Sequence, residues 1–174
     1  NDGGQITAPH DKNIISEVEK ISDFNQINFN YNSELIYEID DEIDKKYIDK
    51  IQSLSVYDNS KSNLKIIFSS LHGTGITQIP NALKAFGFKN ISSVKSQELP
   101  DPEFSTVNSP NPEDLDALEL GIKKLKKENG DILLATDPDS DRVGVALFDN
   151  EKIKILNGNQ LASLIVYYSL KNLD

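Results

Sequence analysis

The chain has 174 residues, and 28 Asp and Glu against 18 Lys and Arg give it a formal net charge of -10 at pH 7. This acidic balance disfavours nucleic-acid binding, which needs clustered basic side chains. The absence of cysteine excludes disulfides and thiolate metal sites, and no apolar run is long enough to predict a membrane span. We therefore expect a soluble, cytoplasmic protein that binds neither nucleic acid nor membrane.

The first part of the chain carries two helical patterns separated by a polar stretch. Apolar residues at helical spacing between residues 14 and 21 predict a short amphipathic helix, and residues 23–33 have the composition of a linker. A second helix is predicted from about Asp41, with Asp40 or Asp41 as its N-cap. Its apolar face would contain Ile43, Tyr47, Ile48, Ile51 and Leu54.

Strand and helix patterns alternate in the rest of the chain. Short β-favouring runs lie at residues 64–68, 91–94, 132–135 and 143–148, and helical patterns lie at residues 76–86, 112–127 and 157–173. A turn at Asp149-Asn150 leads from the last run into residues 153–156. The order β-α-β-α-β-β-α predicts a three-layer α/β/α domain with a small mixed, mostly parallel four-stranded sheet.

One predicted helix has strong signals at both of its ends. Asn111 and Pro112 form a capping residue followed by a proline at the first helical position, with acids in the next two positions. Lysines gather before Gly130, which is the residue type that most often ends a helix. The sequence therefore predicts a helix that begins at Pro112 and stops at Gly130.

An acidic loop follows the buried run at residues 132–135. Asp137, Asp139 and Asp141 alternate with other residues, and Arg142 comes directly after them. Ligands gather at the C-terminal ends of strands in α/β sheets, and carboxylates that are brought together there need a cation such as Mg²⁺ or Ca²⁺. Arg142 offers a planar, permanently charged donor for a phosphate. The loop therefore indicates metal-assisted phosphoryl chemistry.

Three other interpretations of this loop stay open on spacing alone. A solvated acidic turn has the same residue types. A calcium-binding interaction module would use Asp137, Asp139 and Asp141 as the first ligands of an EF-hand, but Arg142 replaces the required Gly and Phe148 the required Glu. An aspartyl phosphatase-like enzyme would use Asp137 as a nucleophile in an Asp-x-Asp motif, although such enzymes usually carry Thr or Val where Asp141 stands.

Residues 137–142 resemble the magnesium loop of the α-D-phosphohexomutases, which include phosphoglucomutase and phosphomannomutase. Ser140 is a small departure from the family pattern at a position that is not a ligand. Other segments match the family in the same order along the chain, and the resemblance is weakest at residues 23–62. The matching segments are residues 1–6, 9–11, 71–75, 100–104, 110–113 and 156–161.

The resemblance implies an enzyme of four domains that interconverts hexose 1-phosphate and hexose 6-phosphate through a phosphoserine and a hexose bisphosphate. It implies that Asp137, Asp139 and Asp141 hold Mg²⁺, that Arg142 contacts the phosphate, and that His72 binds substrate. It also implies a division of the chain into three parts. These are residues 1–40 as the end of the first domain with its linker, residues 41–155 as the second domain, and residues 156–174 as the start of the third.

The sequence lacks the family's Ser-His-Asn-Pro loop, which carries the catalytic serine. Residues 109–112 read Ser-Pro-Asn-Pro, without the histidine, and the family's sugar-binding loop is also missing. The chain begins with Asn1 and contains no methionine. We therefore expect a fragment with no catalytic residue of its own, inactive alone, whose partners are the remaining domains of the same chain and the hexose phosphates that they bind.

Overall fold

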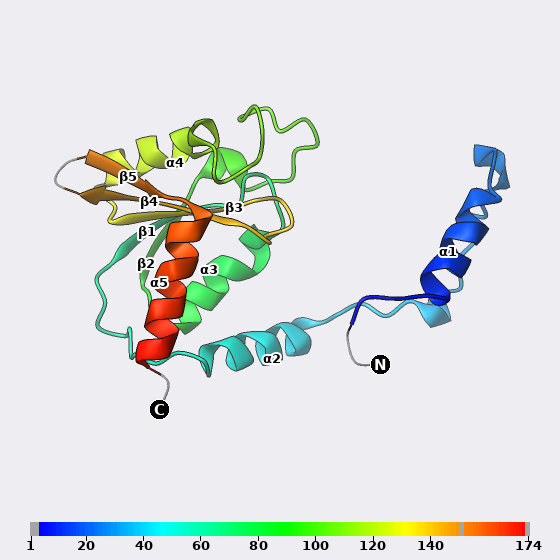
Figure 1. The fold of residues 1–174 in the computed structure, drawn as a ribbon, viewed down its shortest axis with the longest axis horizontal. Helices are drawn as coiled ribbons and strands as arrows, with labels where there is room; N and C mark the ends of the chain where they lie inside the picture. Colours follow the sequence, from blue (N-terminus) through cyan, green and yellow to red (C-terminus); the bar gives the residue numbers. More distant parts are fainter. Residues whose placement is uncertain (1–3, 150–151, 173–174) are drawn as a thin grey trace. The chain divides into compact units, whose positions relative to one another are not determined.

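The computed structural model describes residues 4–149 and 152–172 (Figure 1). The chain divides into two units, Asn1–Ile39 and Asp40–Asp174, which are described separately. Asn150 of the predicted turn, residues 1–3 of the first matching segment and Leu173 at the end of the predicted last helix lie outside the described residues. No helix in the described ranges is long and apolar enough to cross a membrane.

The first unit contains three short helices. Helix α1 spans His10–Glu19, and the 3-10 helices η1 and η2 span Phe24–Gln26 and Ser33–Leu35. None of the described residues in this unit is buried, and even its aromatic side chains Phe24, Phe29 and Tyr31 are exposed. The described part of the unit therefore has no hydrophobic core of its own.

The second unit begins with helix α2, Asp41–Gln52, at the place where the sequence predicts a helix. The side chain of Asp40 accepts a hydrogen bond from the backbone N–H of Glu42 at 3.1 Å. This bond satisfies one of the free donors at the helix N-terminus, so the predicted N-cap is confirmed. Helix α2 packs against helix α3, Gly75–Ala85.

Within the described residues, five strands form one mixed sheet in the order β2-β1-β3-β4-β5. Strand β1 pairs in parallel with β2 and β3, whereas β3–β4 and β4–β5 are antiparallel. The bounds are Lys65–Ser69 for β1, Asn90–Ser93 for β2, Ile132–Thr136 for β3, Val143–Asp149 for β4 and Lys152–Leu156 for β5.

The mixed α/β fold is as predicted, but the strand count of four is wrong. Residues 152–156 pair with residues 145–149 of β4 and add a fifth strand at the edge of the sheet. Its apolar residues, Ile153 and Ile155, alternate with lysines and pack against the core, as expected for a strand with one solvated face. Parallel and antiparallel pairings are therefore equal in number across the described strands.

Helices cover both faces of this sheet. Figure 1 shows helix α4 on one face, and helices α3 and α5 on the other. Helix α4 spans Leu115–Glu128 and helix α5 spans Gly158–Lys171. The core lies between α4 and the central strands, where Leu118, Leu125 and Leu133 are at most 1% exposed. The three-layer arrangement is therefore the predicted one.

The predicted ends of helix α4 are wrong by one to three residues. The helix begins at Leu115 with Asp114 as its N-cap residue. The side chain of Asn111 instead accepts from the N–H of Glu113 and forms a local turn, which leaves Pro112 in the loop. At the other end the helix stops one residue before Gly130, at Asn129, which adopts the left-handed conformation with φ 50°. Asparagine tolerates this conformation because its short side chain can satisfy local backbone groups.

Candidate functional site

The acidic loop connects strand β3 to strand β4 and lies beside the turn that follows strand β1. Strands β1 and β3 are parallel neighbours, with Ser69 opposite Ala135, so their C-terminal ends share one edge of the sheet. The backbone N–H and the hydroxyl of Thr74 both donate to the carbonyl of Pro138, at 2.8 and 3.1 Å. The turn therefore holds the acidic loop through the backbone of the residue between the first two aspartates.

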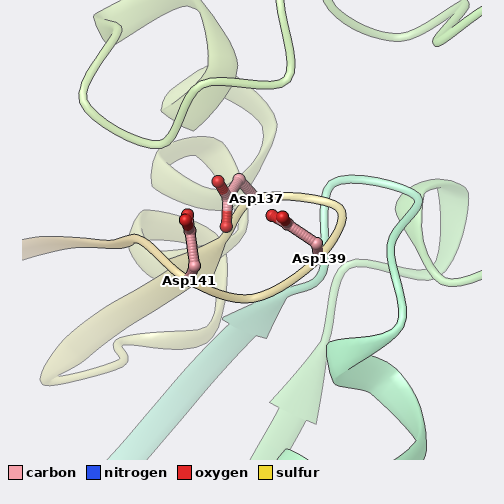
Figure 2. A group of neighbouring side chains, drawn as sticks. All are labelled: Asp137, Asp139 and Asp141. Carbon is pink, nitrogen blue, oxygen red and sulfur yellow. The ribbon is translucent and has the colours of Figure 1, made fainter. Parts of the chain in front are cut away.

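The three predicted metal ligands lie together (Figure 2). One carboxylate oxygen from each of Asp137, Asp139 and Asp141 lies within 4.8 Å of the others. Asp137 is 1% exposed, whereas the other two side chains reach solvent. Carboxylate oxygens are the ligands that Mg²⁺ and Ca²⁺ prefer, so the chemistry of this donor set fits a hard divalent cation.

Arg142 fixes the buried member of this cluster. Its backbone N–H donates to Asp137 Oδ1 at 3.0 Å, and its Nε donates to Oδ2 at 2.8 Å. Burial alone would raise the pKa of Asp137, but these hydrogen bonds outweigh it and hold that pKa below its usual value. The Arg142 side chain is 53% exposed, so its terminal nitrogens reach solvent next to the cluster. The side chain predicted to contact phosphate therefore also positions a predicted ligand.

The charges of the cluster repel one another in the absence of a cation. The pKa of Asp141 is raised because its protonated form donates a hydrogen bond to Asp137 and because the charges of Asp139 and Asp137 face it. Arg142 opposes this effect but does not cancel it. Because Asp141 ionises less readily beside the other two carboxylates, a bound cation would stabilise its charged form.

Asp141→Asn is expected to raise the Tm of the metal-free chain at pH 7. A carboxyl group whose pKa is higher in the folded state stabilises the fold at low pH and loses that contribution as the pH rises through its pKa. Asparagine removes the charge and keeps a donor for Asp137. The gain should shrink as the pH falls through the raised pKa of the folded state, and it should be absent well below about 4, where the carboxyl group is protonated in both states. Thermal unfolding in EDTA measures it, and a lower Tm than that of the unmodified chain contradicts it.

Two hydroxyl groups beside the acidic loop were not predicted from the sequence. Ser140 has a left-handed backbone with φ 64°. Its Oγ and the Oγ of Thr136 are buried and lack a hydrogen-bond partner in the described part of the chain. A Cβ on Gly75 would lie 2.8 and 2.7 Å from these two oxygens, so a larger residue at the start of helix α3 would force these side chains to move. The glycine in the sequence motif at residues 71–75 was the available signal.

His72 lies in the turn after β1 and is 7% exposed. Its Nδ1 is 2.9 Å from the carbonyl oxygen of Leu99, and its Nε2 is 2.8 Å from Thr106 Oγ1. The ring of Phe104 packs against it edge-on, with the ring centroids 6.2 Å apart. Both ring nitrogens therefore have partners within the chain, and a role for His72 in substrate binding stays a prediction.

A family model described as phosphoglucomutase/phosphomannomutase, alpha/beta/alpha domain II, matches residues 45–150 of this chain. Human glucose 1,6-bisphosphate synthase is 39% identical over 174 aligned residues, which cover 95% of this chain and 28% of the human protein. Phosphoglucomutase of Staphylococcus aureus strain MRSA252 is 34% identical over 175 residues, covering 98% of this chain and 32% of that enzyme. The chain thus spans less than a third of the length of these relatives.

A solved structure shares the fold. The crystal structure of a phosphoglucomutase/phosphomannomutase family protein from Burkholderia thailandensis superposes with a TM-score of 0.61 at 22% sequence identity. The superposition covers 74% of this chain and 26% of that one. At this identity the likeness bears on the arrangement of the strands and helices alone.

Proposed function

The chain belongs to the phosphoglucomutase/phosphomannomutase family, and on that basis we propose that it supplies the Mg²⁺ loop of a phosphohexomutase. Such an enzyme interconverts hexose 1-phosphate and hexose 6-phosphate through a phosphoserine and a hexose bisphosphate. The observation that carries the proposal is the convergence of Asp137, Asp139 and Asp141 within 4.8 Å at the C-terminal end of a central strand. The remaining domains would be the partners of this chain in the full-length protein.

The residues of the loop have separate tasks in this proposal. Asp137, Asp139 and Asp141 would hold Mg²⁺, which when bound supplies positive charge that offsets the charge of a phosphoryl group in transfer. Arg142 uses its Nε to hold Asp137 and leaves its terminal nitrogens for a phosphate oxygen. The turn at residues 71–75 keeps the loop backbone in place through Thr74.

The domain boundaries and the inactivity of the isolated chain are part of the same proposal. Residues 1–40 would close the first domain, residues 41–155 would form the second, and residues 156–174 would begin the third. The catalytic serine would lie on the first domain, so the 174-residue chain alone should show no mutase turnover. The location in the cytoplasm stays a prediction.

Two of the three rival interpretations, the aspartyl phosphatase-like enzyme and the EF-hand, are disfavoured by the structure of the loop. A nucleophilic Asp137 would need an accessible carboxylate oxygen, but the residue is 1% exposed and both of its oxygens accept hydrogen bonds from Arg142. An EF-hand has a helix on each side of its loop. Here strands β3 and β4 flank it.

A glucose 1,6-bisphosphate synthase is a second candidate for the full-length protein. It is favoured by the 39% identity to the human protein of that name. Both candidate enzymes act on a hexose phosphate and transfer a phosphoryl group. They differ in the product that accumulates. A mutase regenerates its bisphosphate intermediate, whereas a synthase transfers a phosphoryl group from a separate donor to a hexose monophosphate and releases the bisphosphate as its product.

Product analysis of the full-length protein separates these candidates. With glucose 1-phosphate, Mg²⁺, a trace of glucose 1,6-bisphosphate and an acyl phosphate as a separate phosphoryl donor, we expect glucose 6-phosphate to form while the bisphosphate and the donor stay constant. Net accumulation of the bisphosphate would favour the synthase. Release of inorganic phosphate from a generic ester, abolished by Asp137→Asn, would contradict both and favour the phosphatase-like enzyme.

A further inference from the structure

A buried chain of hydrogen bonds links the end of strand β1 to the long loop after strand β2. Gln97 is 0% exposed, Ser69 3% and His72 7%. Gln97 Oε1 accepts from Ser69 Oγ at 2.7 Å, and Gln97 Nε2 donates to Thr106 Oγ1 at 3.1 Å. Thr106 Oγ1 is in turn 2.8 Å from His72 Nε2, and His72 Nδ1 is 2.9 Å from the carbonyl oxygen of Leu99. We call this set of residues the buried relay.

With the His72 ring neutral, the chemistry of the end groups sets the direction of each bond in the buried relay. The carbonyl of Leu99 can only accept, so Nδ1 of His72 carries a proton. Nε2 of the neutral ring then accepts from the hydroxyl of Thr106, and that hydroxyl accepts from the amide of Gln97. The hydroxyls of Thr106 and Ser69 each donate one hydrogen bond and accept another. A network that is satisfied in this way specifies one arrangement of its members.

The buried relay is attached to a strained piece of backbone. Leu71 and His72 have φ values of 46° and 65°, in the left-handed region that residues other than glycine seldom adopt. Such a conformation persists only where surrounding contacts determine it. Here the N–H of Leu71 donates to Ser69 Oγ at 3.2 Å, and the N–H of His72 donates to the carbonyl of Gln97 at 2.9 Å. The relay therefore supplies the contacts that hold this turn.

The strained turn continues directly into Gly73 and Thr74, which contact the acidic loop. Gly73 leaves no room for a side chain, because a Cβ there would lie 2.3 Å from Pro138 Cα. Thr74 donates two hydrogen bonds to the carbonyl of the same proline. Since Pro138 joins Asp137 to Asp139, the position of the turn sets the spacing of two of the three carboxylates.

We propose that Gln97, Thr106 and His72 are positioning residues that hold the turn at residues 71–75 and, through Thr74 and Pro138, keep the acidic loop in its cation-binding geometry. The cation itself rests on the proposed function, but the mechanical link between relay and loop does not. His72 acts here through its two ring hydrogen bonds, without contact to substrate.

Thr106→Val tests this proposal, because valine keeps the shape of the half-buried side chain and removes its hydroxyl. Amide hydrogen exchange followed by NMR should show the N–H groups of Thr74 and Arg142 exchanging about tenfold faster, the factor that the loss of one typical net hydrogen bond produces. The ¹⁵N resonance of His72 Nε2 should shift, since its donor is gone. In the full-length protein the affinity for Mn²⁺ should fall by about tenfold, the lower end of the range for residues that orient metal ligands.

Two control variants separate positioning from general loosening of the fold. Thr106→Ser restores the hydroxyl and should return exchange at Thr74 and Arg142 to the rate of the unmodified chain. Ile122→Val, a small truncation in the core under helix α4, should leave exchange at these two amides unchanged relative to the rest of the sheet. Unchanged exchange in Thr106→Val, or no rescue by serine, would overturn the proposal.

The failure of the proposed function would look different. If Asp139→Asn left Mn²⁺ affinity of the full-length protein unchanged while Thr106→Val accelerated exchange as expected, the metal assignment would fall and the link between relay and loop would stand. If Asp139→Asn abolished Mn²⁺ binding and Thr106→Val changed neither exchange nor affinity, only the positioning role would fall.

Discussion

Asp139→Asn in the full-length protein is expected to lower mutase turnover by at least about 100-fold, because the loss of one charged ligand removes much of the electrostatic stabilisation of the transferred phosphoryl group. The Asp139 side chain is exposed, so its replacement should leave the fold intact. A coupled assay for glucose 6-phosphate measures the turnover, and thermal unfolding checks that the variant is folded.

The matched control for this prediction is Asp49→Asn, which neutralises an exposed carboxylate on helix α2. It changes the net charge by the same amount, so any loss of turnover in Asp139→Asn beyond the control comes from the position of the charge. Turnover of Asp139→Asn within a few-fold of the control would refute the assignment of this residue as a metal ligand.

Gly73→Ala is expected to destabilise the chain by about 1–3 kcal/mol, the usual range for atoms forced into a packed site. The added Cβ would lie 2.3 Å from Pro138 Cα and 2.5 Å from its carbonyl oxygen. These are backbone atoms, so relief requires movement of the acidic loop and not the rotation of a side chain. Urea unfolding measures the loss, and amide chemical shifts of residues 137–142 report the movement.

Gly158→Ala is the matched control, because it adds the same Cβ at a site where the neighbouring side chain can move. A Cβ on Gly158, at the start of helix α5, would lie 2.7 Å from Glu113 Oε1, which is the end of a flexible side chain. We expect a free energy of unfolding within about 0.5 kcal/mol of the unmodified chain, as for most exposed substitutions. If both variants lost the same free energy of unfolding, the close contact between Gly73 and Pro138 would not be the cause of the destabilisation in Gly73→Ala.

The local sequence predicted those parts of the structure that depend on residues close to one another in the chain. The strand before Asp137 is an uninterrupted apolar run, and the alternating carboxylates follow it directly. A loop of six residues that leaves one strand and enters the next has little freedom, so the convergence of its acids could be expected. Asp40 is a cap for the same reason, because its partner is two residues away.

The features that were missed depend on partners far away in the sequence. Pro112 was expected inside helix α4, but it stays in the loop, where its carbonyl packs so closely against Gly144 that no Cβ would fit. Gln97 is the centre of the buried relay, yet nothing in its neighbourhood in the sequence distinguishes it from a surface glutamine. The prediction of four strands omits residues 153–156, because only their pairing with β4 identifies them as strand β5.

The central claim is that Asp137, Asp139 and Asp141 hold a divalent cation in the assembled protein. Manganese has the ligand preferences of a hard cation and scatters X-rays anomalously, so it can mark this site directly. In crystals of the full-length protein soaked in Mn²⁺, we expect one strong anomalous peak among the three carboxylates, which disappears in Asp139→Asn. An anomalous peak for Mn²⁺ elsewhere in the protein, with none at this loop, would contradict the assignment of the three aspartates as metal ligands.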